Sequence, residues 1–452
     1  MIFFSGRKDV SVLDEKRTWD YAQRLSRLVQ IETISQHGQT ELTKFHRFHQ
    51  VLKQEFPHIS AACEWEEFDG SLLLRWPGKD SSKAPILLMN HHDVVEATGT
   101  WKYPPFSGMI AEDKVWGRGT LDTKGGLFGM LQAADELAAE GFVPAQDVYF
   151  ESACTEETDG SGADHISQVL QQRGIHFSFV LDEGGMIVFD PIGGSNGVFA
   201  MVGVGEKGCA DLKFIARSNG GHASTPPKNS PLVRLGRFMA AAERKELFEV
   251  KVSPTVREMF LRMAPTVNGP LKNIMAHPDA FNPLITSVLP RISETAGAML
   301  KTTLAFTMAQ GSEGNNVLPQ EAWVVGNMRF SHHQGGKASI AVVTELAKKY
   351  NIEVEVMDPG FESPISDFNS DGFHLVERAV AANFPGVYTS PYVMTGASDA
   401  RYFSRVSDCC LRFVPFRISD EQLGSIHGLN ESVDLETLVP AVDFYQYIIR
   451  EA

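Results

Sequence analysis

The fold of this chain is decided by the stretch PILLMNHHDVV, residues 85–95. Its first six residues form a short apolar run, which is typical of a strand buried on both faces of a sheet. Similar runs recur at residues 148–153 and 177–181, and the segment 125–139 has a helical pattern. Strands that alternate with helices predict βαβ units, and therefore an α/β fold with a mainly parallel central sheet.

A different pattern begins near residue 206. The segment 210–216 alternates apolar and polar residues, as in a sheet with one covered face. Further strands are predicted at 302–307, 321–329 and 352–357, and helices at 231–244 and 338–350. The βα pattern returns from about Asp367. We therefore expect a catalytic domain of residues 1–205 and 359–452, with an α+β domain of residues 206–358 inserted into it.

Composition excludes several classes of protein. The chain has 452 residues and a formal net charge of -15, which argues against a nucleic-acid partner because phosphate binding needs clustered Lys and Arg. The acidity also fits poorly with an anionic membrane surface. The start of the chain is apolar for only a few residues, whereas a secretory segment needs roughly 7–15 and a membrane helix roughly 20. Five cysteines without regular spacing are not a disulfide framework. We expect a soluble cytoplasmic protein without membrane or nucleic-acid partners.

Polar side chains follow the first buried strand. His91 and Asp93 share one face of the chain there, because side chains alternate along a strand. A histidine that binds a metal usually donates its other ring N–H to a carboxylate, so Asp93 could orient His91. A pair of polar residues that ends a strand explains this short motif equally well.

Other candidate ligands stand at comparable places. Asp122 lies between a Gly-rich turn and a helix, where it is either a metal ligand or an N-cap. Glu156 and Glu157 follow the second strand, where one could bind a metal while the other takes a proton, although a solvated acidic loop is the common explanation. Asp182 ends the third strand and His427 lies near the C-terminus. Together these groups would repel one another without a cation. The sequence therefore predicts a metal site, for which zinc is suited and Co²⁺ or Mn²⁺ are substitutes.

Five motifs occur in one order along nearly the whole chain. They are H-x-D, G-R-G-x-x-D-x-K-G, E-E-x-x-G-x-G-A, D-E-G-G and I-H-x-x-N-E. This order resembles the metallopeptidase family of aminoacylase, acetylornithine deacetylase, succinyl-diaminopimelate desuccinylase and carboxypeptidase G. The D-E-G-G form and the long block after Val252 are most similar to the branch of carboxypeptidase S and N-fatty-acyl-amino-acid hydrolase. The resemblance implies a zinc-exopeptidase-like catalytic domain with an inserted lid and dimerisation domain.

The resemblance also implies a role for each matching residue of the first domain. Two zinc ions are expected, of which His91 and Asp182 hold one, Glu157 and His427 hold the other, and Asp122 bridges them. Glu156 is the implied general base, and Asp93 orients His91. The Asp122–Thr123 peptide corresponds to one that is often cis in the family.

In the inserted domain, the segment GGHASTPP at 220–227 resembles the lid motif of the family. The resemblance implies that His222 stabilises the oxyanion, often in the active site of a partner subunit, although glycines around it are also consistent with a simple turn. Asn316 and Arg329 match the pair that grips the carboxylate of the substrate, and the loop at Gly396 backs that pocket.

The implied reaction is hydrolysis of the amide bond next to a free-carboxylate amino acid, by a homodimer that associates through the lid. The substrate would be a Gly-X peptide or an N-acyl amino acid. Two alternatives stay open, namely a deacylase of an N-acetyl or N-succinyl biosynthetic intermediate and a metal-free binding protein on the same fold. Loss of a ligand would favour the second alternative, but all five ligand positions and Glu156 are filled.

Overall fold

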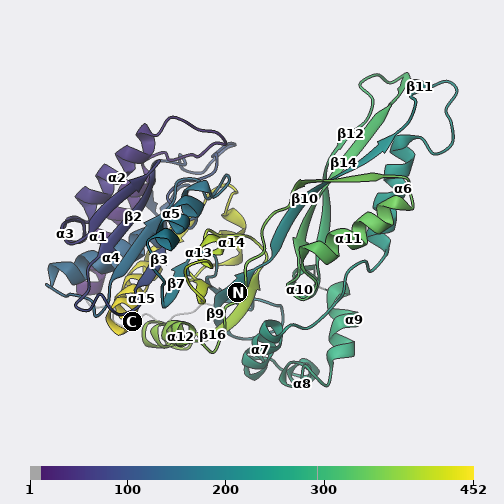
Figure 1. The fold of residues 1–452 in the computed structure, drawn as a ribbon. Helices are drawn as coiled ribbons and strands as arrows, with labels where there is room; N and C mark the ends of the chain where they lie inside the picture. Colours follow the sequence, from purple (N-terminus) through teal and green to yellow (C-terminus); the bar gives the residue numbers. More distant parts are fainter. Residues whose placement is uncertain (1–11, 293) are drawn as a thin grey trace. The chain divides into compact units, whose positions relative to one another are not determined.

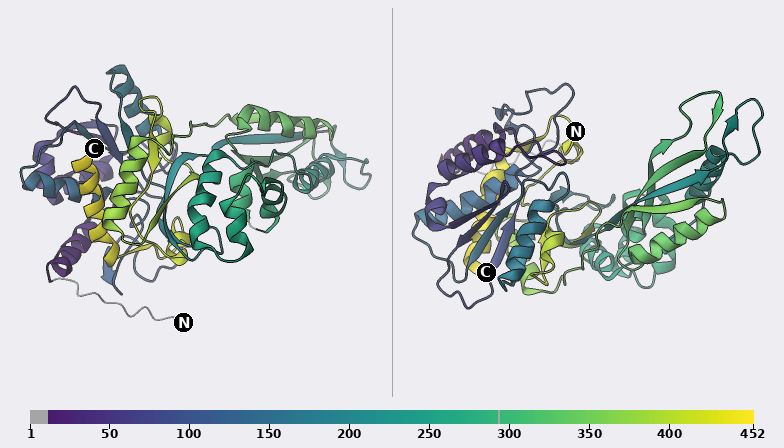
Figure 2. Two further views of the ribbon diagram at one scale, coloured as in Figure 1. Left: turned by 90° about the horizontal axis from the view of Figure 1, so that it is seen from below. Right: turned by 45° about the horizontal axis from the view of Figure 1, so that its top comes forward.

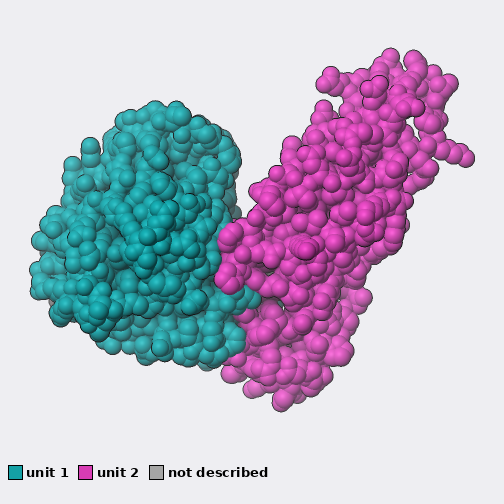
Figure 3. Space-filling model, viewed as in Figure 1, with its two compact units in different colours: residues 1–205, 365–392, 398–452 teal, residues 206–364, 393–397 magenta. Residues whose placement is uncertain are grey.

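The computed structural model describes residues 12–292 and 294–452, and it divides into two compact units (Figure 3). The first contains the described residues up to Gly205 together with Ile365–Tyr392 and Ser398–Ala452. The second contains Glu206–Pro364 and Val393–Ala397. The first unit was predicted to resume at residue 359 but resumes at 365, because residues up to Pro364 still follow the second unit's sheet, where Cys209 N donates to Phe361 O at 3.2 Å.

The central sheet of the first unit is mixed, with a parallel centre (Figure 1). Its four central strands run parallel in the order β6 (Val148–Ser152), β3 (Ile86–Met89), β7 (Phe179–Asp182) and β17 (Cys410–Arg412). Antiparallel neighbours flank them, with β2 (Ser71–Trp76) and β1 (Glu64–Phe68) on one side and β9 (Val198–Glu206) on the other. The sheet is completed by β16 (Tyr388–Met394) and β8 (Ile187–Phe189). The predicted parallel arrangement thus describes the centre of the sheet.

Helices cover both faces of this sheet (Figure 2). Leu88 and Leu181 point into the core beneath α1 (Val12–Val29), α4 (Lys124–Ala139), α12 (Asp371–Asn383) and α15 (Leu438–Glu451). Leu87 and Val180 point the other way, against α5 (Ser161–Gln172) and α13 (Ala400–Phe403). The strands are apolar on both faces for this reason. Because the four central strands are parallel, their carboxyl ends meet at one edge of the sheet.

The remaining elements of the first unit lie around this framework. They are α2 (Thr43–Glu55), α3 (Pro57–Ala62), α14 (Asp420–Ser425), the 3₁₀ turn η2 (Leu435–Thr437) and a small antiparallel sheet of β4 (Met109–Ala111), β5 (Lys114–Trp116) and β18 (Ser432–Asp434). The pairing of β18 with β5 brings the C-terminal region beside the turn that precedes α4.

Helix α4 begins directly against two other segments. A Cβ atom on Gly125 would lie 2.2 Å from Thr120 O, and one on Gly126 would lie 2.0 Å from Asn90 Oδ1. Only glycine allows the helix start to approach so closely. The turn that carries Asp122 is thereby held against the end of β3.

The second unit contains a four-stranded antiparallel sheet. Its order is β12 (Thr303–Gln310), β14 (Glu321–Phe330), β10 (Gly208–Arg217) and β15 (Glu353–Asp358). The helices α6 (Pro231–Arg244) and α11 (Gly335–Lys348) pack on one face of this sheet, where Phe238 of α6 contacts Phe214 of β10. The short strands β11 (Gly221–His222) and β13 (Val317–Leu318) pair with each other beyond β10 and β14.

The block after Val252, for which the sequence predicts no element, is helical. It contains α7 (Pro254–Met263), the 3₁₀ turn η1 (Ala264–Thr266), α8 (Pro270–Ala276), α9 (Asn282–Ile292) and α10 (Glu294–Leu300). The sequence analysis predicted no helix in this block because it contains several prolines. In α7 and α8, however, proline lies in the first turn, where it is well tolerated. Across the described ranges, no helix is both long enough and apolar enough to cross a membrane.

Candidate metal centre

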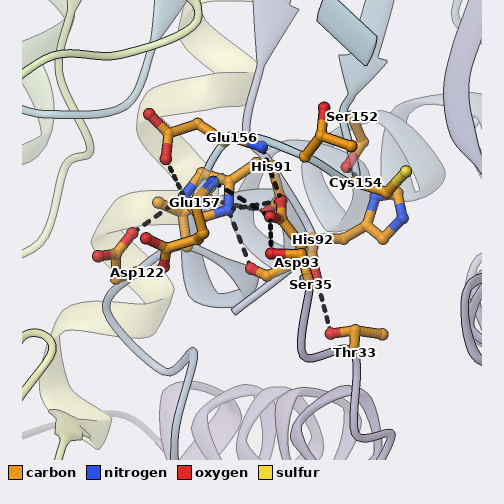
Figure 4. A network of polar contacts seen from close by, with 12 residues as sticks. Thr33, Ser35, His91, His92, Asp93, Asp122, Ser152, Cys154, Glu156 and Glu157 are labelled. Atoms are coloured by element: carbon orange, nitrogen blue, oxygen red, sulfur yellow. Dashed lines mark hydrogen bonds and ion pairs between the residues drawn. The ribbon is translucent and has the colours of Figure 1, made fainter. Parts of the chain in front are cut away.

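The polar residues predicted from the first unit gather at the carboxyl edge of its parallel strands, and Figure 4 shows His91, Asp93, Asp122, Glu156 and Glu157 there. These residues lie at or just after the ends of β3, β6 and β7, in the turn before α4 and in the loop after α14. They are His91 and Asp93 after β3, Glu156 and Glu157 after β6, Asp182 at the end of β7, Asp122 before α4, and His427 after α14.

The carboxylate of Asp122 stands between two imidazoles. Its Oδ1 lies 3.0 Å from His91 Nε2, whereas its Oδ2 lies 3.1 Å from His427 Nε2. Glu157 Oε2 is 2.9 Å from the same His427 nitrogen. Ligand atoms of His91, Asp122 and Glu157 all lie within 4.8 Å of one another. Because each oxygen of Asp122 faces a different histidine, this carboxylate is placed to bridge two cations.

The two histidines are paired with carboxylates. Hydrogen bonds to Asp122 and Glu157 raise the pKa of His427 to about 10. Burial lowers the pKa of His91, but hydrogen bonds to Asp122 and Asp93 outweigh this and hold it well above its ordinary value. For Asp122, burial acts to raise the pKa, yet the hydrogen bonds from His427 and His91 bring it below the usual range. A metal ion would displace the protons that these pairs hold.

The edge carries more buried carboxylates than these histidines neutralise. Burial raises the pKa of Glu156 to about 8, and it also raises the pKa values of Glu157 and Asp182. Glu157 Oε1 is buried and has no hydrogen-bond partner in the described part of the chain. Crowded carboxylates of this kind favour a bound cation. The oxygen and imidazole donors, without a thiolate among them, fit zinc or a similar divalent metal.

Asp93 contacts both the histidine and the acidic turn. His91 Nδ1 lies 3.0 Å from the carbonyl oxygen of Asp93 and 3.4 Å from its carboxylate Oδ1. The carboxylate accepts hydrogen bonds from the backbone N–H of Glu156 at 3.3 Å and of Glu157 at 3.1 Å, and from Ser35 Oγ at 2.7 Å. Asp93 therefore positions the turn that carries both glutamates as well as the ring of His91.

Glu156 lies beside the ligand cluster. Its Oε2 is 4.0 Å from His91 Nε2, and its side chain is only 12% exposed. It does not belong to the group of ligand atoms that His91, Asp122 and Glu157 form. A carboxylate next to a metal site, but outside its ligands, is suited to move a proton.

The end of β7 offers two carboxylates where the sequence analysis chose one. Asp182 Oδ2 accepts a hydrogen bond from Ala400 N at 2.7 Å. The pKa of Glu183 is held well above its ordinary value by burial and then by the carboxylates of Asp182, Asp122 and Glu156. Glu183 thus belongs to the same electrostatic cluster. The D-E-G-G motif already contained this signal, since both acids directly follow a buried strand.

The peptide bond between Asp122 and Thr123 is cis, as the resemblance implied.

Within the second unit, the predicted catalytic residue His222 and the predicted substrate-binding residue Asn316 lie together. His222 pairs with Val317, and Ala223 N donates to Asn316 O at 2.9 Å. The His222 side chain is exposed, and its Nδ1 is 2.7 Å from Ser224 Oγ.

Arg329 lies in the four-stranded sheet, near the end of β14, where it pairs with Cys209 and its Nε donates to Asn327 Oδ1 at 3.1 Å. At roughly 3.3 Å per residue, about 26 Å of β14 separates Glu321, at the Asn316 end of the strand, from Arg329. The structure therefore does not bring Asn316 and Arg329 of one chain together. Gly396 lies in the segment Val393–Ala397 of the second unit.

Comparison with known proteins agrees with this geometry. The sequence profile of Peptidase family M20/M25/M40 matches residues 87–451. Over 445 residues the chain is 30% identical to "Probable carboxypeptidase S-like 2" of Dictyostelium discoideum, covering 95% of this chain and 85% of that protein. It is also 30% identical to the human "N-fatty-acyl-amino acid synthase/hydrolase PM20D1", covering 95% of this chain and 87% of the relative.

A solved structure shows the same fold. The M20 family metallo-carboxypeptidase Sso-CP2 from Sulfolobus solfataricus superposes with a TM-score of 0.70 at 15% identity, over 95% of this chain and 98% of that one. The family match covers most of the chain and includes every candidate residue of the metal centre. The chain belongs to Peptidase family M20/M25/M40 and is a hydrolase of that family.

Proposed function

We propose that the protein uses two zinc ions to cleave the amide bond next to a free-carboxylate amino acid, with N-acyl amino acids or Gly-X peptides as substrates. The observation that carries the proposal is the carboxylate of Asp122, whose two oxygens face His91 and His427 separately. The names of the relatives, which include carboxypeptidase S-like proteins and N-fatty-acyl-amino acid synthase/hydrolases, support this substrate class.

The ligand set follows from the contacts of each group. Glu157 and His427 would hold one ion, and His91 with a carboxylate from the end of β7 would hold the other, while Asp122 bridges. Bound zinc supplies Lewis-acid chemistry towards a carbonyl group and water. Both Asp182 and Glu183 are candidates for the β7 carboxylate. The hydrogen bond that Asp182 Oδ2 accepts from Ala400 N favours Asp182, because it orients this carboxylate and leaves Oδ1 for an ion.

Glu156 is the proposed proton carrier. Its carboxylate is mostly buried, lies 4.0 Å from His91 Nε2 and is outside the group of ligand atoms. A carboxylate in that position can accept a proton from the attacking water and return it to the leaving nitrogen. His222 would donate to the developing oxyanion, and Arg329 would bind the free carboxylate through its planar guanidinium.

A deacylase of N-acetyl or N-succinyl intermediates is the alternative with the same chemistry. It differs in the acyl group, which the name of the human relative gives as a fatty acyl chain for that protein. A series of acyl chain lengths therefore separates the two functions. The cytoplasmic location stays a prediction from the sequence.

We further propose a homodimer that forms through the second unit. Strand β12 is an edge strand with an exposed outer side, and Met308 on it is 58% exposed. Leu232 and Val233 at the start of α6 are 50% and 44% exposed, and Leu232 lies beside Gly311 just after β12. An exposed edge strand with apolar neighbours is suited to pair with another chain. A second chain could also supply His222, which lies far from Arg329 of its own chain.

The ligand assignment predicts different effects for two neighbouring carboxylates. Asp182→Asn should lower the zinc content after dialysis from about two ions per chain to about one, because a neutral amide is a poor zinc ligand. Glu183→Gln is the matched control and should have the smaller effect. Elemental analysis of both variants decides this, and the reverse order of effects would assign the ligand to Glu183.

The role of Glu156 predicts a separation of metal binding from catalysis. Glu156→Gln should keep the zinc content of wild type and lose about 10²-fold or more of kcat on the best N-acyl amino acid, because general base catalysis contributes this much. The panel should include acetyl, succinyl and longer acyl chains on one amino acid, beside Gly-X dipeptides. A variant with full activity would remove Glu156 from the mechanism.

The dimer model predicts that the two edges of the second sheet differ. Met308→Lys on β12 should shift the protein from dimer to monomer in sedimentation velocity and lower kcat, because His222 of a partner would be lost. Met357→Lys is the matched control, since Met357 is 54% exposed on the opposite edge strand β15. If Met308→Lys stays dimeric or both variants dissociate equally, the β12 interface is wrong.

A further inference from the structure

An ion pair joins two loops of the metal centre that lie far apart in the sequence. Arg118 precedes the turn with Asp122, and Glu431 follows the loop with His427. Arg118 Nη1 donates to Glu431 Oε2 at 2.7 Å, and the two residues are 2% and 0% exposed. Neither residue has a role in the ligand set proposed above.

Each partner of this pair also bonds to the backbone of the opposite loop. Glu431 Oε1 accepts from Leu121 N at 2.8 Å and from Asp122 N at 3.2 Å. Arg118 Nη2 donates to Gly428 O at 2.8 Å, directly after His427. The pair is therefore bonded to the backbone of the bridging aspartate and to the residue next to a terminal ligand. These hydrogen bonds link the loop of Asp122 to the loop of His427.

His427 needs such support more than His91 does. His91 is buried and its Nδ1 lies 3.0 Å from a carbonyl oxygen, which fixes the ring. The His427 side chain is 56% exposed, and its polar contacts within the described ranges run through Nε2 to Asp122 and Glu157. Its backbone has a φ of 58°, in the left-handed region that a non-glycine residue rarely adopts. The position of this ring therefore depends on how its loop is held.

A purely architectural role is the competing explanation, because buried ion pairs are often replaceable by apolar residues. The contacts argue against a purely architectural role. The Glu431 carboxylate accepts a hydrogen bond from the backbone N–H of Asp122, and the Arg118 guanidinium donates one to a backbone carbonyl of the His427 loop. We propose that Arg118 and Glu431 are positioning residues that set the affinity of the metal position formed by Glu157 and His427. This inference rests on the proposed two-metal function.

Glu431→Gln is the first test variant. Glutamine keeps the length of the side chain and an oxygen for the amides of Leu121 and Asp122, but it removes the charge that faces Arg118. Loss of an outer partner of a metal ligand typically weakens metal binding by about 10–100-fold. We expect this loss for the weaker of two zinc sites only, so that the variant keeps about one ion per chain after dialysis. Arg118→Lys should act in the same direction, because an ammonium cannot reach Glu431 and Gly428 in the planar fork of a guanidinium.

Asp147→Asn is the matched control. Asp147 is also buried, accepts from Arg75 Nε at 2.8 Å with one oxygen and from the backbone N–H of Gly78 at 2.8 Å with the other. It stands at the start of β6, at the opposite end of that strand from Glu156 and Glu157. This variant loses a similar charged contact without touching a ligand loop, and it should bind two zinc ions with the affinities of wild type.

The measurement is calorimetric titration of the metal-free full-length proteins with zinc, beside visible absorption of the cobalt-loaded forms and thermal unfolding. The inference predicts one unchanged and one weakened site in Glu431→Gln and Arg118→Lys, an altered cobalt spectrum, and recovery of kcat at excess zinc. Two sites of wild-type affinity in both variants would overturn it, as would equal weakening of both sites together with a lower Tm. If Glu431→Gln does not fold, Arg118→Lys decides. A wild type that binds no zinc would instead contradict the proposed function itself.

Discussion

The first unit is organised around one carboxylate, that of Asp122, which is shared between two imidazoles in a mostly buried place. Around it stand more carboxylates than these imidazoles can neutralise, and burial raises the pKa values of most of them. Such an arrangement is costly in a protein without a cation, because charged groups lose hydration without gaining enough partners. Bound divalent cations would satisfy the same groups. The surrounding structure is therefore best understood as the means of holding these ligands at fixed positions.

The parallel centre of the sheet positions most of these residues. The strands β3, β6 and β7 end at one edge, so the residues that follow them converge although they are far apart in the sequence. The turn before α4 joins them because glycines let the helix start approach Asn90 and Thr120 closely. The His427 loop is held beside this turn by the pairing of β18 with β5 and by the Arg118–Glu431 ion pair. The second unit carries His222, Asn316 and Arg329 on a separate sheet, and this division suits an enzyme whose substrate-binding groups belong to a lid.

Much of this could be predicted from the sequence, for identifiable reasons. The buried strands could be predicted because they are apolar on both faces. The candidate ligands could be predicted because they lie in motifs of a recognisable order, most of which follow those strands. The helices after Val252 were not predicted, since proline at a first turn resembles a helix breaker in the sequence. The choice between Asp182 and Glu183 depends on which way each side chain turns after β7. The Arg118–Glu431 pair joins residues separated by more than 300 positions, and nothing local marks that contact. The separation of Asn316 from Arg329 depends on strand register, which the motifs do not contain.

The most direct test of this account is a crystal structure of the zinc-loaded protein with diffraction data on both sides of the zinc absorption edge. The account predicts two anomalous peaks per chain, one on each side of the Asp122 carboxylate, with His91 at one peak and His427 with Glu157 at the other. Absence of zinc from this edge of the sheet, or a single peak that Asp122 does not contact, would contradict it.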